Sequence, residues 1–181
     1  MFKYIIDEEL ELRLISMQDC EEIFDLIDSN RNHLREWLPW VDGTKSSKDT
    51  KSFIESSMNQ FATNNGFQAG IWSKGKIVGI IGLHQLSWHH KNTSIGYWLA
   101  EEFQGKGIIT RACKVVIEHV FIDLGLERVE IRCADKNYKS QAIPERLGFT
   151  KEGVCRNAEN LYGSFVNNIV YGLLNEEWNS L

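Results

Sequence analysis

The sequence predicts an α/β protein built on a mixed, mostly antiparallel sheet of six or seven strands that is flanked by helices. A strand and three helical segments come first, a hairpin meander follows, and strand-like and helical segments then alternate. Such an order indicates a sheet that is partly antiparallel and partly parallel. The strongest periodicity belongs to a helix near residues 105–124, whose apolar side chains form one stripe.

The first part of the chain carries clear start signals for its elements. Residues 11–15 alternate as a strand, and Ser16 with Asp19 resembles a capping box that opens a helix. A second helix is expected over residues 31–38, ending before a proline, because the residue before a proline disfavours helical backbone. A third helix begins near Ser46, and its apolar residues recur at helical spacing: Phe53, Ile54, Met58 and Phe61.

The rest of the chain changes to strand-like alternation around a hairpin turn at Lys74–Gly75. Further strands are expected at residues 67–71, 77–83, 93–99, 129–133, 150–156 and 164–174. Helices are expected over residues 105–124 and 140–147, and a glycine follows each of them as a stop signal. The stripe of the longer helix consists of Ile109, Ala112, Cys113, Val116, Val120 and Leu124.

Length and composition limit the class of protein. The chain has 181 residues, for which we expect one domain spanning residues 1–181. Its formal charge of −5 disfavours a broad nucleic-acid surface, and no apolar run approaches the roughly 20 residues that cross a bilayer. The first residues lack the layout of a secretory signal, so we expect a cytoplasmic protein. The four cysteines are scattered without zinc-site spacing, so we expect no metal.

The main candidate for a binding site is a turn between a strand and the long helix: Gln104, Gly105, Lys106, Gly107, Ile108, Ile109 and Thr110. Glycines here let the backbone approach a ligand and direct successive N–H groups at one point. The helix N-terminus adds positive potential, so the turn suits a diphosphate group. The alternative is a tight turn without a ligand, which a lone Gly-x-Gly would favour. The spacing matches neither a Walker motif nor the dinucleotide fingerprint.

This turn resembles the acetyl-CoA loop of the GNAT superfamily, although Ile109 stands where that superfamily usually has Gly or Ala. A second segment, with Asn137 and Ser140 followed by Leu147-Gly148-Phe149, resembles the superfamily's next motif. The resemblance implies acetyl-CoA as the acetyl donor. It also implies that Asn137 forms hydrogen bonds with the pantetheine amides and that Ser140 lies near the thioester sulfur. The alternative role for both residues is a helix cap, which can coexist with ligand contact.

Three more segments, residues 10–14, 37–40 and 158–163, resemble the ribosomal-protein N-terminal acetyltransferases, and the likeness covers nearly the whole chain. It implies an N-acetyltransferase whose acceptor is the N-terminal α-amine of a ribosomal protein, with Glu159 as the candidate base. It also implies a sheet that is splayed at the strand ending near Leu99. There the backbone at Trp98 and Leu99 would supply an N–H group to the thioester carbonyl.

Several alternatives remain open at the level of sequence. Glu159 is equally a candidate for a solvated residue in a turn, and Pro144 occupies the position where many superfamily members have a tyrosine acid. Ile109, Pro144 and Asn168 depart from the family pattern, which permits a non-catalytic sensor or scaffold that binds coenzyme A. A small amine, such as a polyamine or an aminoglycoside, is another candidate acceptor.

The histidine cluster and the tryptophans are weaker indications of function. His84, His89 and His90 indicate a solvated hairpin rim more than a zinc site. The tryptophan content makes a surface for homo-oligomer formation plausible.

Overall fold

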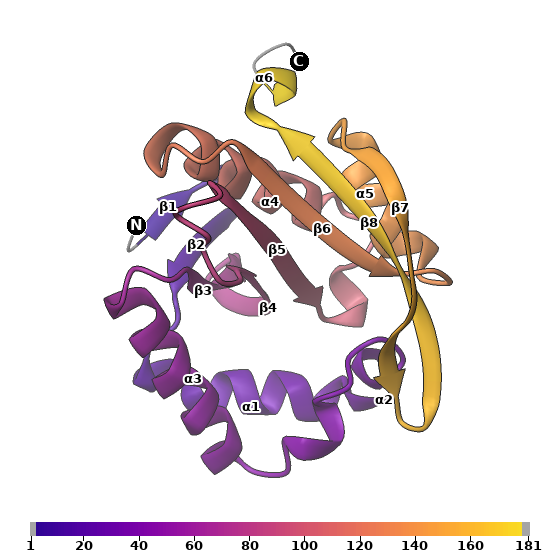
Figure 1. The fold of residues 1–181 in the computed structure, drawn as a ribbon. Coiled ribbons are helices and arrows are strands. Elements are labelled where there is room, and N and C mark those ends of the chain that lie inside the picture. Colours follow the sequence, from indigo (N-terminus) through magenta and orange to yellow (C-terminus); the bar gives the residue numbers. More distant parts are fainter. Residues whose placement is uncertain (1–2, 179–181) are drawn as a thin grey trace. The chain divides into compact units, whose positions relative to one another are not determined.

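The computed structural model describes residues 3–178, whose eight strands form one mixed sheet in the order β1-β2-β3-β4-β5-β6-β8-β7 (Figure 1). The pair β5–β6 is parallel, whereas β1–β2, β2–β3, β6–β8 and β7–β8 are antiparallel. The predicted α/β class with a mostly antiparallel sheet is therefore confirmed. The additional strand is β1 (Lys3–Ile5), whose three exposed residues carry no alternation that the sequence could show.

The described residues divide into two compact units, residues 3–82 with 97–108 and residues 83–96 with 109–178. The first contains β1, β2 (Leu10–Leu14), η1 (Met17–Asp19), α1 (Cys20–Ser29), α2 (Arg31–Arg35), η2 (Val41–Gly43), α3 (Ser47–Ala62), β3 (Phe67–Ser73), most of β4 (Lys76–Leu83) and η3 (Glu101–Phe103). The second contains most of α4 (Ile108–Glu118), η4 (His119–Asp123), β6 (Arg128–Ala134), α5 (Tyr138–Arg146), β7 (Thr150–Leu161), β8 (Ser164–Leu174) and α6 (Asn175–Trp178). Strand β5 (Asn92–Leu99) contributes to both units. The expectation of a single domain stays a prediction.

The helices of the first unit begin where the sequence indicated. Capping boxes form at Ser16 with Asp19 and at Ser46 with Asp49, as predicted. The core cluster of this unit contains Ile15, Ile23, Ile27, Leu34, Val41, Ile54, Trp72, Ile77 and Ile80.

The predicted apolar stripe of α3 was only partly right. Ile54 is buried, but Phe53, Met58 and Phe61 are 41%, 47% and 38% exposed. Thr50 and Ser57 face the core instead, because they lie near Ile54 on the same side of the helix.

The long helix of the second unit is shorter than the predicted span of 105–124. Gly105 and Gly107 lie before it in left-handed backbone, and residues 119–123 form a π-helical turn that follows α4. The predicted stripe is otherwise confirmed, because its members from Ile109 to Val120 are buried. Gly125 ends the segment with a φ of +62°.

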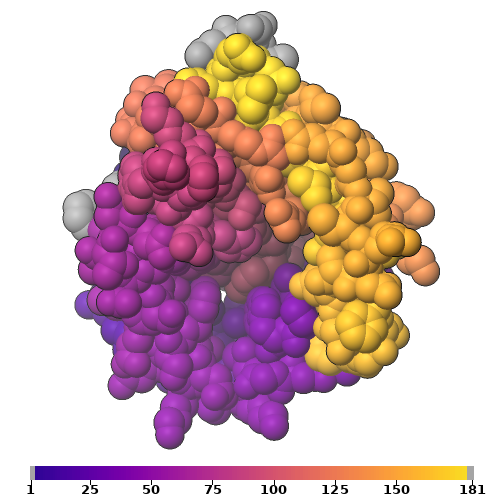
Figure 2. All heavy atoms as spheres, viewed as in Figure 1, coloured from indigo at the N-terminus to yellow at the C-terminus, as the bar shows by residue number. Residues whose placement is uncertain are grey.

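The last two strands form a long hairpin that ends in a two-residue turn at Tyr162 and Gly163, both with positive φ (Figure 1). Its outer part lies on the molecular surface, where Phe165 is 62% exposed (Figure 2). Strand β7 continues to Leu161, beyond the predicted end at residue 156. Glu159 therefore lies in a strand and not in a turn.

Candidate active site

The turn between β5 and α4 keeps its backbone exposed. Gly105 and Gly107 have φ angles of +73° and +68°, a region that residues with side chains adopt at a cost. A Cβ atom on either glycine would meet no atom within 4 Å, so the backbone angle and not crowding requires glycine. Gly105, Lys106 and Gly107 are exposed, whereas Ile108 is buried as α4 begins. The backbone of residues 105–107 therefore lies at the surface, as a diphosphate site requires, whereas the N–H of Gln104 donates to the carbonyl of Glu101 at 3.1 Å.

Two side chains from the region of α1 and α2 support this turn. Asn30 Oδ1 accepts a hydrogen bond of 3.0 Å from the N–H of Glu101, the first residue of η3. Gln104 Nε2 lies 2.9 Å from His33 Nε2, and the ring nitrogen accepts because an amide nitrogen only donates. Sequence reasoning missed Asn30 and His33, since 71 residues separate each from its partner.

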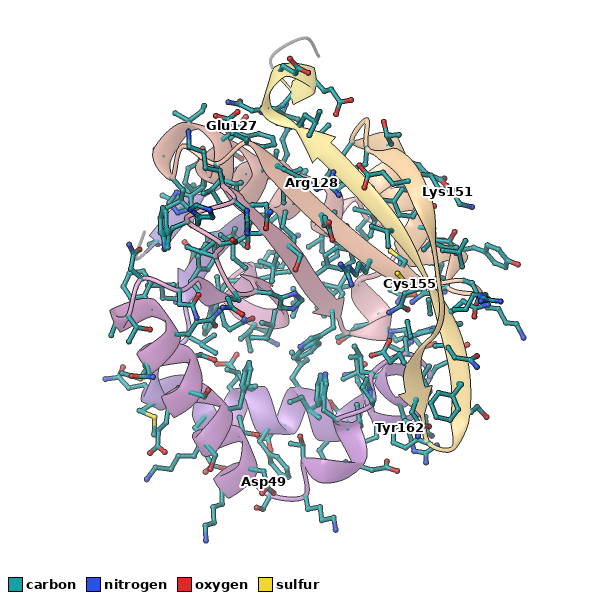
Figure 3. The ribbon with its side chains drawn as sticks, viewed as in Figure 1. Asp49, Glu127, Arg128, Lys151, Cys155 and Tyr162 are labelled. Carbon is teal, nitrogen blue, oxygen red and sulfur yellow. The ribbon has the colours of Figure 1, made fainter. Side chains whose placement is uncertain are left out.

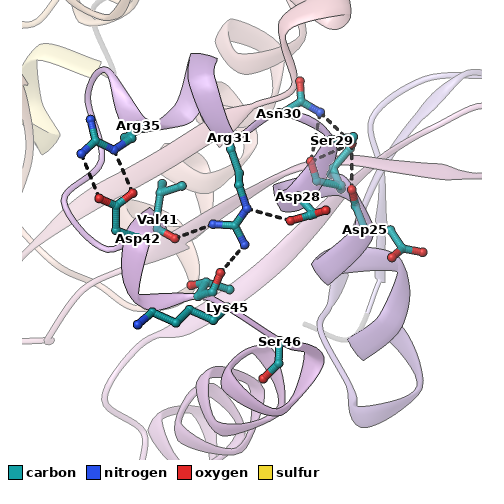
Figure 4. A network of polar contacts seen from close by, with 12 residues as sticks. Asp25, Asp28, Ser29, Asn30, Arg31, Arg35, Val41, Asp42, Lys45 and Ser46 are labelled. Carbon is teal, nitrogen blue, oxygen red and sulfur yellow. Dashed lines mark hydrogen bonds and ion pairs between the residues drawn. The ribbon is translucent and has the colours of Figure 1, made fainter.

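Helix α2 is in turn anchored by arginines (Figure 4). The guanidinium of Arg31 donates to three groups: Asp28 Oδ1 at 2.7 Å, the carbonyl of Val41 at 2.9 Å, and the carbonyl of Thr44. Arg35 donates to both carboxylate oxygens of Asp42, at 2.8 and 2.9 Å, and this hydrogen bonding lowers the pKa of Asp42. The segment that carries Asn30 and His33 is thereby fixed in the first unit.

The end of β5 approaches β4 closely. A Cβ atom on Gly79 would lie 2.3 Å from the carbonyl oxygen of Trp98 and 3.0 Å from Leu99 Cα, so only glycine fits there. Ala100 donates its N–H to the carbonyl of Val78 at 2.9 Å. Because successive amides of a strand point to opposite edges, the N–H of Leu99 points away from β4. Of the two predicted residues, Leu99 is therefore the candidate donor toward a thioester carbonyl.

In the second unit, Asn137 caps α5. Its Oδ1 accepts the N–H of Ser140 at 3.1 Å, so the capping role is present. This cap does not use the side-chain nitrogen of Asn137, which remains the candidate donor to pantetheine. Ser140 is half-buried, and its Oγ lies 3.2 Å from Cys133 Sγ on β6. The sequence analysis placed Cys133 only at the end of the expected strand 129–133 and gave it no role beside Ser140.

Helix α5 is held against the sheet by a buried polar network. Tyr171 of β8 is 1% exposed, and its hydroxyl donates toward Gln141 Oε1 at 3.2 Å and Glu145 Oε1 at 3.0 Å. Gln141 Nε2 donates to the carbonyls of Ala134 and Asp135, at 3.2 and 2.9 Å. Burial and the hydrogen bond to Glu145 raise the pKa of Tyr171 to about 12. These bonds fix the turn that carries Ser140.

An irregularity in the β7–β8 ladder positions Glu159. Cys155 lies opposite Asn168 and Glu159 lies opposite Val166, so three residues of β7 bulge against one residue of β8. Inside this bulge, Asn157 has a φ of +48°. Its N–H donates to the side-chain oxygen of the facing β8 residue, Asn167, at 3.0 Å. Glu159 is half-buried.

Three further polar side chains near the predicted site residues and the histidine cluster have partners within the protein. Arg146 donates to Thr110 Oγ1 at 3.4 Å, and Lys106 Nζ lies 4.9 Å from the ring centroid of Phe103. His84 Nδ1 lies 2.9 Å from Ser94 Oγ, and burial and the charge of Arg132 lower the pKa of His84. Across residues 3–178, no group of three or more His, Cys, Asp or Glu side chains is arranged to hold a metal ion.

The predicted site residues belong to both units. The first carries Trp98, Leu99, Gln104, Gly105, Lys106, Gly107 and Ile108, and the second carries Ile109, Thr110, Asn137, Ser140 and Glu159. Ile109, where the family pattern has a smaller residue, is 7% exposed, so its side chain packs inside. The predicted splay of the sheet near Leu99 and the convergence of these residues on one ligand stay predictions.

Comparison with known proteins gives a consistent result. Residues 9–150 match the acetyltransferase (GNAT) domain. A protein of Bacillus subtilis (strain 168), YdaF, provisionally named a ribosomal N-acetyltransferase, is 39% identical over 180 residues and 98% of both chains. The ribosomal-protein-serine acetyltransferase of Escherichia coli (strain K12) is 28% identical over 160 residues, which cover 88% of this chain and 89% of that protein. The structure of the microcin C7 self-immunity acetyltransferase MccE, with acetyl-CoA and AMP, has a TM-score of 0.89, 33% identity, and coverage of 93% and 94%.

The chain therefore belongs to the GNAT acetyltransferase family. It is an acetyl-CoA-dependent N-acetyltransferase. The exposed, glycine-bearing turn and the capped start of α5 fit acetyl-CoA as its acetyl donor. Among the described residues, no helix is long and apolar enough to cross a membrane.

Proposed function

We propose that the acceptor is the N-terminal α-amine of a protein, with a ribosomal protein as the first candidate. The observation that carries this proposal is the similarity to YdaF, which is 39% identical over 98% of this chain, supported by the similarity to the E. coli ribosomal-protein-serine enzyme. A ribosomal substrate agrees with the predicted cytoplasmic location. Self-association of the enzyme stays a prediction.

Each predicted site residue has its own role in the proposed acetyl transfer. Backbone N–H groups from Gly105 to Thr110 bind the diphosphate of acetyl-CoA, and Asn137 binds the pantetheine amides. The amine nitrogen attacks the thioester carbon, a C–N bond forms, and the C–S bond then breaks. The N–H of Leu99 stabilises the carbonyl oxygen, which carries negative charge during the reaction.

One side chain takes the proton of the amine, and another stabilises the leaving group. Glu159 takes the proton that the amine loses, directly or through a water molecule. Ser140 donates a hydrogen bond to the departing sulfur, which leaves as the thiolate of coenzyme A. The demand on both is modest, because an α-amine has a reference pKa of about 8 and a thiol one of about 8.5.

The test is an assay of coenzyme A release with purified full-length enzyme and peptides that copy ribosomal-protein N-termini. We expect turnover on peptides with a free α-amine and none on the same peptides with acetylated N-termini. The acetylated peptides contain lysine side chains, so coenzyme A release with them would reveal acetylation of an amine other than the N-terminal one. Turnover on polyamines or aminoglycosides but on no peptide would contradict the proposed acceptor.

A small-molecule amine is the second candidate, because the microcin C7 self-immunity acetyltransferase MccE, whose structure holds the small molecule AMP beside acetyl-CoA, is 33% identical over most of both chains. The same assay distinguishes the two acceptors. Mass spectrometry of ribosomal-protein N-termini from cells with and without the enzyme gives an independent result. Loss of one N-terminal acetyl group in cells without the enzyme would support the ribosomal acceptor.

A further inference from the structure

The four cysteines of this chain differ in burial, and one of them contacts a predicted site residue. Cys155 on β7, labelled in Figure 3, is exposed, whereas Cys113 on α4 and Cys133 on β6 are buried. Cys133 is 3% exposed, and its Sγ lies 3.2 Å from the Oγ of Ser140 on α5. A buried free cysteine usually packs as a small apolar residue, so its contact with the hydroxyl of a predicted site residue is unusual.

Contacts within the second unit fix the backbone around Ser140. Its N–H donates to Asn137 Oδ1, and the N–H of Asn137 donates to the carbonyl of Ala134, the last residue of β6. Gln141, the next residue, donates to the same carbonyl through its side chain. These hydrogen bonds hold the Cα of Ser140 beside β6 but do not set the torsion of its hydroxyl group. Cys133 lies within hydrogen-bond distance of that hydroxyl and can set it.

Either atom of the Cys133–Ser140 pair can donate, but the two directions leave different groups available. A hydroxyl oxygen has two lone pairs and one hydrogen, so Ser140 can accept from the thiol and donate elsewhere at the same time. Sulfur of a neutral thiol is a weak acceptor, so the hydroxyl loses little when it turns from Cys133 to a stronger acceptor. A thiolate is such an acceptor, because hydrogen bonds to ionised groups are stronger than those between neutral groups.

The surroundings of Cys133 favour its protonated form, which is the form that can donate. Burial raises the pKa of Cys113 and of Tyr171, and the negative charge that Cys133 would carry raises the pKa of both further. The repulsion between two charges is mutual, so a thiolate at Cys133 is disfavoured by the same neighbours. The thiol therefore keeps the hydrogen that it donates to Ser140.

We propose that Cys133 is a positioning residue, whose S–H donates to Ser140 Oγ and directs the Ser140 O–H toward the departing sulfur of coenzyme A. This inference rests on the proposed function, in which Ser140 stabilises the leaving group. Cys133, Ser140 and Asn137, the proposed ligand of the pantetheine arm, all belong to the second unit. As the C–S bond breaks, its electron pair goes to the sulfur, and no proton moves along the chain. The two hydrogen bonds strengthen each other, because successive hydrogen bonds polarise one another.

The test is a double-mutant cycle of Cys133→Ala and Ser140→Ala, measured as the single-turnover rate of acetyl transfer at saturating acetyl-CoA. Cys133→Ala removes the donor, so the rate should fall about 3- to 10-fold, the size of one neutral hydrogen bond. In the Ser140→Ala background the same change should alter the rate less than about twofold, because the group that Cys133 positions is absent. An equal loss in both backgrounds would show that Cys133 acts through packing alone, and that result would overturn the inference.

Two further variants separate the hydrogen bond from the fit of the side chain. Cys133→Ser keeps a donor at the same position and should react within about twofold of the wild-type rate; a loss as large as that of Cys133→Ala would contradict the inference. If Cys133→Ala does not fold, Cys133→Val, which fills the space of the thiol without a donor, takes its place in the cycle. Cys113→Ala is the matched control, because it removes another buried thiol of the same unit, and its rate should equal that of the wild type.

Failure of the proposed function gives a different result. If the enzyme acetylates a small amine and no peptide, the proposed acceptor is wrong, but the cycle is then measured on that amine, because the leaving group is the same. If Ser140→Ala reacts at the wild-type rate, the proposed role of Ser140 fails and the inference fails with it. A slow Ser140→Ala enzyme beside an unimpaired Cys133→Ala enzyme overturns the inference alone.

Discussion

At the residue scale, Gly107 is held in left-handed backbone with a φ of +68° and open space around it. Gly107→Ala forces a side chain into that conformation, at a cost of about 1–2 kcal/mol, or moves the turn. We expect the dissociation constant of acetyl-CoA, measured by calorimetry, to rise about 10-fold. Gly43→Ala is the control, because Gly43 has ordinary φ and nothing within 4 Å. Equal affinity in both variants would exclude a role for the turn.

Glu159 gives a second prediction at this scale. Glu159→Gln keeps the shape of the side chain and removes its capacity to take a proton, so kcat should fall about 10²- to 10⁴-fold. The dissociation constant of acetyl-CoA should not change. Kinetics that match the wild type across the pH range would remove Glu159 from the mechanism.

The sequence identified these residues by type and could not give their surroundings. Gly105 and Gly107 were predicted correctly as turn residues, because the requirement for positive φ is local. Cys133 beside Ser140 was missed, because their neighbourhood arises only when α5 packs on β6. The orientation of the Leu99 N–H could not be predicted either, because it depends on which edge of β5 pairs with β4.

At the element scale, the α1–α2 region supports the turn before α4 through Asn30, which accepts the N–H of Glu101. Asn30→Ala leaves that N–H without its partner and should raise the KM for acetyl-CoA about threefold to tenfold, with kcat nearly unchanged. Asn30→Asp keeps the accepting oxygen and should restore the KM. Asn32→Ala, at an exposed position of α2, is the control and should have no effect. A KM that does not respond to Asn30→Ala would show that the turn needs no such support.

Tyr171 makes the packing of α5 dependent on pH. Its pKa is raised from a reference of 10 to about 12, so the folded state favours the protonated hydroxyl. The resulting stabilisation is complete below pH 10 and is lost as the pH rises through about 12. Tyr171→Phe should lower the free energy of unfolding at pH 7 by about 1–2 kcal/mol.

Urea unfolding between pH 9 and 12 checks this prediction. The wild type should lose stability more steeply with pH than Tyr171→Phe, so the difference between them should shrink toward pH 12. Parallel curves would mean that Tyr171 does not titrate with unfolding.

The elements themselves were largely predictable, with errors at their ends. Capping boxes located the starts of α3 and of η1, which runs directly into α1, because a cap is a contact between residues three positions apart. The extension of β7 to Leu161 was missed, because its bulge depends on Asn167 of the facing strand. The short strand β1 was missed because pairing with β2, and not its own pattern, makes it a strand.

At the scale of the whole molecule, binding of acetyl-CoA should stabilise the folded state. A ligand at 100 times its dissociation constant adds about 2.7 kcal/mol, which corresponds to a rise of about 5–10 °C in the melting temperature of a protein of this size. Acetyl-pantetheine, which lacks the diphosphate, should give a much smaller shift at the same concentration. No shift with either compound would contradict diphosphate binding by residues 104–110.

The sequence by itself determined the class of this protein, because the features involved are local. The glycine turn, the capped start of α5 and the alternating strands each depend on residues a few positions apart. The tertiary structure decided the position of Glu159 in β7, the contact of Cys133 with Ser140, and the support of Glu101 by Asn30. These depend on strand register and on packing between segments far apart in the chain, and no local pattern encodes either.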